Sequence, residues 1–226
     1  MPLKIPSLPT VKASLGASLA AACLLLSGFA HAGGQLYEEL SASVRSSLQK
    51  AVSDQAVKET VFTSDQEAWV WLDDMSKRME KRYPNPRERL DFLKTVHYEA
   101  KRAGLDPQLV LGIIEVESAF RKYAVSTVGA QGFMQVMPFW TKEIGTKEHN
   151  LFHLRTNLRY GCTIMRHYLD IEKGNLFRAL GRYNGSLGKP EYPNLVLAAW
   201  KGKWSSQVRT AEAGDVAAGK LKTARQ

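Results

Sequence analysis

Apolar residues recur every three to four positions through most of this sequence, and no alternating run of β-branched residues extends beyond a few positions. A spacing of three to four places side chains on one face of a helix, whereas a strand requires a spacing of two. We therefore expect a mainly α fold. The 226 residues, 44% of them apolar, suffice for one compact domain with appended segments.

Turn-forming residues divide this pattern into helices. Ser64 and Glu67 match a capping box, and the helix that follows should end before the two prolines within 83–86. The next helix should run from Pro86 to Gly104, and further helical patterns cover 36–57, 158–171 and 176–182. The expected buried stripes are Trp69, Leu72, Ser76 and Met79 on the first of these helices and Leu90, Leu93, His97 and Ala100 on the second.

The segment 106–117 is the most apolar helix expected in the chain. Asp106 provides an N-cap and Pro107 a first-turn proline, and apolar side chains then occupy nearly every face. Such a helix is typical of the middle of a domain. A carboxylate near its end is therefore a candidate for chemistry.

The first 32 residues have the pattern of a signal peptide. Lys4 and Lys12 precede the apolar stretch 13–30, and Ala30-His31-Ala32 matches a small-x-small cleavage site. A retained membrane anchor and lipidation at Cys23 are the alternatives, but the stretch is rich in Ala, Ser and Gly and lacks the Leu expected before a lipidated cysteine. We expect cleavage after Ala32, export to the periplasm or cell envelope, and membrane association only through an uncleaved or lipidated N-terminus.

The expected organisation has four parts. Residues 1–32 are the signal peptide, 33–63 an N-terminal helical extension, 64–204 the folded domain, and 205–226 a polar, Ala-rich tail expected to be disordered. Removal of the first part takes away Cys23 and leaves Cys162 as a single buried thiol, so no intramolecular disulfide is possible. The role of the extension is not indicated by its sequence.

The net charge constrains the partners. Because the first 32 residues carry two lysines and no acid, removing them changes the net charge from +9 to +7. A basic exported protein suits an anionic polymer such as the cell wall, whereas nucleic acid is disfavoured because no nucleic-acid-binding motif is present. No histidine pair or Asp/Asn loop has the spacing of metal ligands, so neither a metal nor a cofactor is expected.

Glu117 is the candidate for acid chemistry. It follows Ile113 and Ile114 by four and three residues, so its carboxyl leaves the helix on an apolar face, where desolvation would raise its pKa. A carboxyl that stays protonated near neutral pH can act as a general acid. The alternative is an ordinary helix-end carboxylate paired with Arg121. Glu115 points to the other side of the helix and is expected to be structural or solvent-facing.

The segment after Glu117 favours the first interpretation. ESAF at 117–120, GAQGFMQVMP at 129–138 and YNG at 183–185 follow in this order. With these motifs the chain resembles the soluble lytic transglycosylases, whose catalytic domain is similar to goose-type lysozyme, over roughly residues 65–204. The resemblance implies a lysozyme-like helical domain, here with an N-terminal helical appendage.

The resemblance also implies roles for individual residues. Glu117 matches the single catalytic acid of the family, and Asn157 and Gly161 fall in a helix that closes the site. The positions that would line the groove for the glycan are Ser126, Gln135, Met137, Tyr183 and Asn184.

The reaction implied is non-hydrolytic cleavage of the β-1,4 bond between N-acetylmuramic acid and N-acetylglucosamine in peptidoglycan. Glu117 would protonate the glycosidic oxygen, and the muramoyl 6-hydroxyl would then close a 1,6-anhydro ring. Two alternatives stay open. A goose-type lysozyme-like hydrolase would use a second carboxylate, with Glu143, Glu148, Asp170 and Glu172 as the candidates; a catalytically silent peptidoglycan-binding assembly protein would use none.

Overall fold

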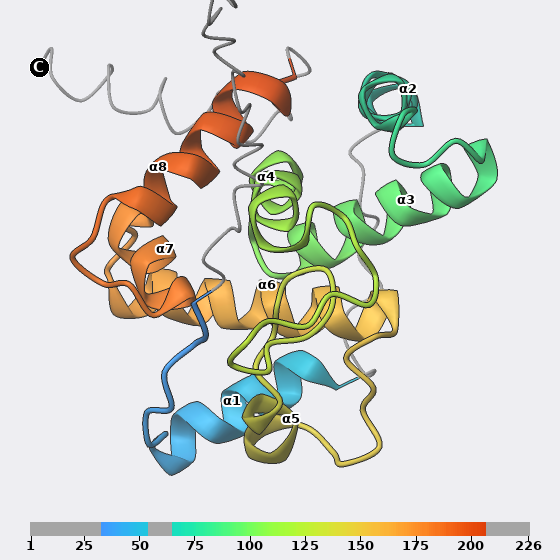
Figure 1. The fold of residues 1–226 in the computed structure, drawn as a ribbon. Helices are drawn as coiled ribbons and strands as arrows, with labels where there is room; N and C mark the ends of the chain where they lie inside the picture. The colour runs from blue at the N-terminus through green and yellow to red at the C-terminus, as the bar shows by residue number, and fades with distance from the viewer. Residues whose placement is uncertain (1–32, 54–64, 207–226) are drawn as a thin grey trace, which may run out of the picture.

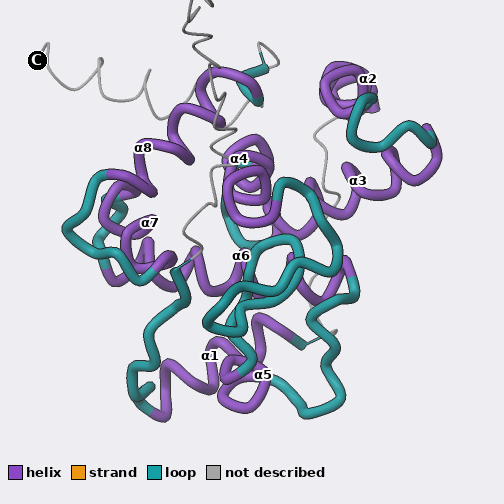
Figure 2. The backbone as a smooth tube through the Cα atoms, viewed as in Figure 1, coloured by secondary structure: helices purple, strands orange, loops and turns teal. Residues whose placement is uncertain are grey.

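The fold is mainly α, as predicted. The computed structural model describes residues 33–53 and 65–206, and within these ranges it contains helices and loops but no strand (Figure 2). The helices are α1 (Ala42–Val52), α2 (Asp65–Met79), α3 (Pro86–Arg102), α4 (Pro107–Ser118), α5 (Phe139–Ile144), α6 (Leu154–Ile171), α7 (Leu176–Asn184), α8 (Glu191–Ala198) and the π-helix η1 (Ala199–Lys203).

Helix α6 runs through the middle of the molecule, with α1 and α5 on one side and α4 on the other (Figure 1). It packs against α3, α7 and α1, while α4 packs against α3, α8 and η1. No helix in the described residues is long and apolar enough to cross a bilayer. The two central helices therefore position the loop that joins α4 to α5 between them.

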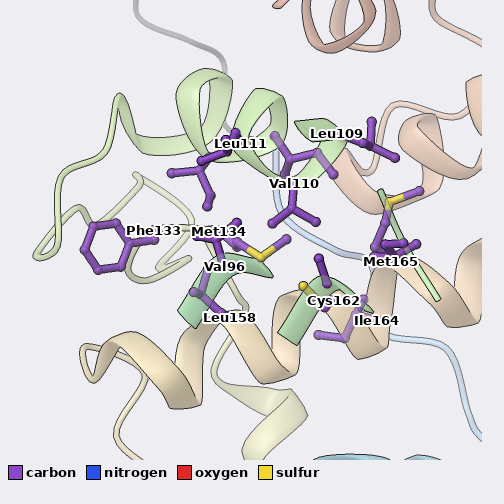
Figure 3. Close-up of a cluster of buried hydrophobic side chains, with 14 of the residues drawn as sticks. Val96, Leu109, Val110, Leu111, Phe133, Met134, Leu158, Cys162, Ile164 and Met165 are labelled. Carbon is purple, nitrogen blue, oxygen red and sulfur yellow. The ribbon is translucent and has the colours of Figure 1, made fainter. Parts of the chain in front are cut away.

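The core lies where α3, α4 and α6 meet this loop. Val96, Val110, Met134 and Cys162 point toward one another there (Figure 3) and are each 0–1% exposed. Burial raises the pKa of the Cys162 thiol well above its usual value. The prediction of a buried, unreactive thiol is confirmed.

The predicted helices agree with the structure except in their details. Helix α4 begins with the predicted Asp106 cap, whose side chain accepts a hydrogen bond from the Gln108 N–H. The helix predicted over 36–57 is shorter, because residues 33–41 are not helical and Ser41 caps α1. Helices α5, α8 and η1 were not predicted. The Ser64 cap, the signal peptide and the tail beyond residue 206 lie outside the described residues.

The buried face of α2 was predicted partly wrongly. Trp69 is 65% exposed, whereas Trp71 is 2% exposed and lies on the same side as Met75 and Met79. Two residues along a helix correspond to about 200° of rotation, so Trp69 and Trp71 point in opposite directions. Because Trp71 packs edge-on against His97 of α3, with ring centroids 5.0 Å apart, the α3 surface selects Trp71.

His97 is a core residue, as predicted. It is 1% exposed, and burial, with a smaller effect of the nearby Lys101, lowers its pKa to about 3. A histidine with this pKa stays neutral over the physiological range and serves packing.

Gly161 allows α6 to approach the loop closely. A Cβ at this position would lie 2.7 Å from the Met134 Cβ, a contact that side-chain rotation cannot relieve. We expect Gly161→Ala to lower the free energy of unfolding by about 1–3 kcal/mol, as overpacking does, despite the better helix propensity of alanine. Gly202→Ala is the matched control, because no described atom lies within 4 Å of a Cβ there. Urea unfolding measures both, and equal stability of the two variants would contradict the packing argument.

Candidate active site

Glu117 lies at the C-terminal end of α4 and is 4% exposed. Its burial follows from the sequence of the helix, because Ile113 and Ile114, on the preceding turn, are completely buried. A carboxyl in such surroundings loses hydration, which disfavours its ionised form. Burial accordingly raises the pKa of Glu117 to about 8, while a hydrogen bond from Tyr192 opposes part of this rise.

Tyr192 is the hydrogen-bond partner of Glu117. Its hydroxyl, on the first turn of α8, donates to Oε1 of Glu117 at 2.7 Å, and the ring is 6% exposed. The Oε2 atom of Glu117 is buried and has no hydrogen-bond partner among the described residues. Because Oε1 accepts the tyrosine hydroxyl, the proton of the neutral carboxyl belongs on Oε2, which is the atom available to a reacting group.

The chain turns sharply directly after Glu117. Ala119 and Phe120 have φ angles of 49° and 65°, which are costly for residues other than glycine. The Ser118 hydroxyl donates to the Phe133 carbonyl oxygen at 2.8 Å and fastens the end of α4 to the following loop. This contact between two of the predicted motifs holds the strained turn in place.

The loop 124–137 is held by side chains that bond to its backbone. Ser126 Oγ accepts from the Ala130 N–H at 3.0 Å, and the Gln135 amide donates to the carbonyl oxygens of Ala124 and Gly132 at 3.1 and 2.9 Å. The Gln135 side chain therefore points into the loop. Its backbone, rather than its amide group, faces the neighbouring chain.

Asn157 of α6 braces the same loop from the core. It is completely buried; its Oδ1 accepts from the Met134 N–H, and its Nδ2 donates to the carbonyl oxygens of Gln131 and Leu151, all at 2.8 Å. Three hydrogen bonds from one amide fix the loop at a defined distance from α6. Asn157 acts on the site through the loop.

Tyr183 closes the loop from the side of α7. It is completely buried, and its hydroxyl donates to the Met134 carbonyl oxygen at 2.7 Å and not to Glu117. Asn184 is 4% exposed at the end of the same helix, and Met137 is half-buried at the end of the loop. The residues that were predicted to line a groove thus gather around the loop, and the contact to the catalytic carboxyl comes from Tyr192.

Tyr192 was not identified from the sequence. It lies 75 residues after Glu117, in a helix that was not predicted, and no motif marks it. An apolar pattern over 191–200 immediately after the YNG motif was the available signal for that helix. The tyrosine on its first turn was then a candidate.

The other carboxylates named from the sequence have partners of their own. Glu115 pairs with Arg82 and Lys203, both at 2.7 Å, in agreement with a structural role. Of the candidate second carboxylates, Glu143 pairs with Arg45 and Asp170 with Arg166. The described residues include no cluster of three or more His, Cys, Asp or Glu side chains that could hold a metal ion.

The raised pKa of Glu117 predicts a pH-dependent gain in stability for Glu117→Gln. The pKa rises from 4.5 to about 8 on folding, so the folded chain retains a proton that the unfolded chain loses, and stability falls as the pH rises between these values. Gln cannot ionise. The variant should gain about 3 kcal/mol over the wild type between pH 4.5 and pH 7, at 1.36 kcal/mol per pH unit. Urea unfolding with the exposed Glu80→Gln as control tests this, and a gain independent of pH would refute it.

Comparisons with known proteins agree with the resemblance drawn from the motifs. Residues 94–192 match the model of the Transglycosylase SLT domain. Over 47 residues the chain is 57% identical to membrane-bound lytic murein transglycosylase C of Actinobacillus pleuropneumoniae serotype 5b, covering 21% of this chain and 13% of that protein. Over 115 residues it is 31% identical to the transglycosylase of Enterobacteria phage PRD1, covering 48% of this chain and 42% of that protein.

Among solved structures, an inactive mutant of lytic transglycosylase Slt from Pseudomonas aeruginosa matches with a TM-score of 0.42 and 24% identity, over 66% of this chain and 26% of that one. The chain spans less than half the length of each of these relatives. The matched family model extends from α3 to Tyr192, and so covers Glu117, the loop and the YNG motif. The predicted resemblance is confirmed, and residues 94–192 are a transglycosylase SLT domain.

Proposed function

We propose that this chain is a lytic transglycosylase that cleaves the β-1,4 bond between N-acetylmuramic acid and N-acetylglucosamine in peptidoglycan and leaves a 1,6-anhydro end. The observation that carries this proposal is the buried carboxyl of Glu117, with its pKa raised to about 8 and one oxygen held by Tyr192. At neutral pH it is a neutral acid with a proton to donate.

The reaction has two proton transfers, both at Glu117. In the first, the carboxyl proton passes to the glycosidic oxygen as the bond to the anomeric carbon breaks, and the acetamido group of the substrate stabilises the positive charge. In the second, ionised Glu117 takes the proton of the muramoyl 6-hydroxyl, whose oxygen bonds to the anomeric carbon. Bonds and protons balance, the enzyme returns to its starting state, and neither a cofactor nor a metal takes part.

The surroundings of Glu117 favour this reaction over hydrolysis. A retaining hydrolase holds a second carboxyl about 5 Å from the acid, and an inverting one about 6.5–9.5 Å away. The pKa of Glu117 responds to burial and to Tyr192, with no contribution from another carboxylate. An acid that acts alone needs the substrate to supply both the charge stabilisation and the nucleophile. The non-catalytic alternative would not require a buried carboxyl at all.

We further propose that Ser126, Gln135, Met137, Tyr183 and Asn184 hold the glycan, largely through the backbone of the loop that they order. Export with cleavage after Ala32, to the periplasm or cell envelope, is part of the same proposal. A net charge of +7 on the remaining chain suits an anionic wall polymer.

Digestion in heavy-oxygen water tests the reaction type. The closing oxygen comes from the 6-hydroxyl of the sugar, so the new muramoyl ends should contain no heavy oxygen, and their mass should be lower by one water than that of a hydrolysed end. Glu117→Gln should release no fragments, because Gln is nearly isosteric but has no carboxylic proton. Mass spectrometry of the released muropeptides reads both results. Stoichiometric label at the anomeric carbon would instead identify a hydrolase.

Tyr192→Phe tests the role of the hydrogen bond to Glu117. Removing a donor that lowers the pKa of Glu117 should move the basic limb of the kcat profile upward from pH about 8. The loss of a charge-assisted hydrogen bond of about 1.5–3 kcal/mol should reduce kcat roughly 10- to 100-fold. Tyr98→Phe on α3 is the control. A reduced kcat with an unmoved basic limb would mean that Tyr192 serves only packing.

A further inference from the structure

Residues 33–35 lie directly against the residues assigned to glycan binding. Gln35 is 2% exposed; its Nε2 donates to the carbonyl oxygens of Gln135 and Tyr183 at 3.2 and 3.1 Å, and its Oε1 accepts from the Met137 N–H at 2.9 Å. One side-chain amide thus uses all its main hydrogen-bonding capacity on backbone groups of the loop and of α7 (Figure 1).

The two glycines before Gln35 fit as closely. A Cβ on Gly33 would approach Asn184 Oδ1 to 3.0 Å, and one on Gly34 would approach Met137 Sδ to 2.8 Å and Val128 Cγ2 to 3.1 Å. Glycine permits such close backbone approach. The segment is therefore fitted into the space between the loop and α7, and it contacts four of the five residues assigned to substrate.

The chemistry of Gln35 resembles that of the proposed substrate. A carboxamide and an acetamido group each present one carbonyl acceptor and an N–H donor about an amide plane. The Met137 N–H and the carbonyl oxygens of Gln135 and Tyr183 are complementary to either group. Both sugars of peptidoglycan carry an acetamido group at C2, so Gln35 occupies a site suited to an N-acetylated sugar.

The chain that follows Gln35 is held less firmly. Leu36 and Tyr37 are 64% and 58% exposed, and the ion pair between Arg182 and Glu38 is at the surface, where such pairs contribute about 0–1 kcal/mol. Helix α1, in contrast, is anchored on α5 and α6 with Leu48 and Val52 buried. The segment is therefore tethered at α1, and residues 33–40 can leave without unfolding the domain.

We propose that residues 33–35 form an intramolecular inhibitor, in which the Gln35 carboxamide takes the place of an acetamido group of the glycan and must be displaced before substrate binds. This inference rests on the proposed function for the identity of the displaced ligand. Removing the Gln35 amide should open the site, and fastening the segment should close it.

The first test is Gln35→Ala in the purified full chain, with Gln49→Ala on the exposed side of α1 as control. Loss of an internal competitor held by about three hydrogen bonds should lower KM for peptidoglycan roughly 5-fold or more without changing kcat, at about 1 kcal/mol net for each bond. The control should match the wild type. An unchanged or raised KM would overturn the inference and would mean that Gln35 supports the fold of the loop.

The second test fastens the segment reversibly. Gly34→Cys with Val128→Cys, in a chain that also carries Cys23→Ser, places two thiols where the native atoms lie within van der Waals reach, and Cys162 is buried and inert. Oxidation should lower cleavage at least 10-fold, and dithiothreitol should restore it. The two single cysteine variants, treated alike, should not respond. Full cleavage by the oxidised double variant would refute inhibition.

A binding measurement separates this inference from the proposed reaction. In a Glu117→Gln background, calorimetry with the tetramer of N-acetylglucosamine should detect binding to the reduced double variant and weak or no binding to the oxidised one. If the oligomer binds in this way while wild-type chain cleaves no peptidoglycan, the inhibitor stands and the proposed reaction fails. If the wild type cleaves but the oligomer binds both forms equally, or neither, the inhibitor is refuted and the reaction stands.

Discussion

The protonated carboxyl of Glu117 exists because α4 and α8 together exclude water from it. Helix α4 is apolar on nearly every face, which a helix can be only when other elements surround it. Helix α8 packs against α4 and brings in a single polar group, the Tyr192 hydroxyl, which satisfies Oε1 and leaves Oε2 for chemistry. One donor is a compromise: two would lower the pKa of the acid further, and none would leave both oxygens unpaired.

The same economy governs the loop beside Glu117. Its residues bond little to each other as regular structure, with only two isolated bridges, Val125–Gln131 and Gln131–Val136, among the described residues. Its shape comes instead from amide and hydroxyl side chains of neighbouring helices, above all Asn157, directed at single backbone groups. A loop shaped in this way keeps other backbone N–H and carbonyl groups facing outward, and those groups can hold a neutral, amide-rich polymer.

Local patterns predicted the parts of the site that depend on one helix. The Asp106 cap and the apolar run after it defined α4, and the position of Glu117 after Ile113 and Ile114 indicated its burial. Contacts that depend on the meeting of distant helices could not be predicted. Tyr192 is 75 residues from Glu117, and the choice of Trp71 over Trp69 was made by the surface of α3. Gln35 bonds to residues 100 and 148 positions away, and nothing in its local sequence indicates a partner.

A tethered inhibitor of this kind would make the proposed enzyme respond to the length of its substrate. A segment attached through α1 is present at its site at an effective concentration in the millimolar range, and no dilution reduces it. A short soluble fragment that matches only the hydrogen bonds of Gln35 competes poorly against such a concentration. A polymer that also contacts neighbouring groups adds binding free energy that residues 33–35, limited to three residues, cannot match. Displacement then favours intact wall over released fragments, and it does so through neutral hydrogen bonds alone, without a charge change or a second ligand.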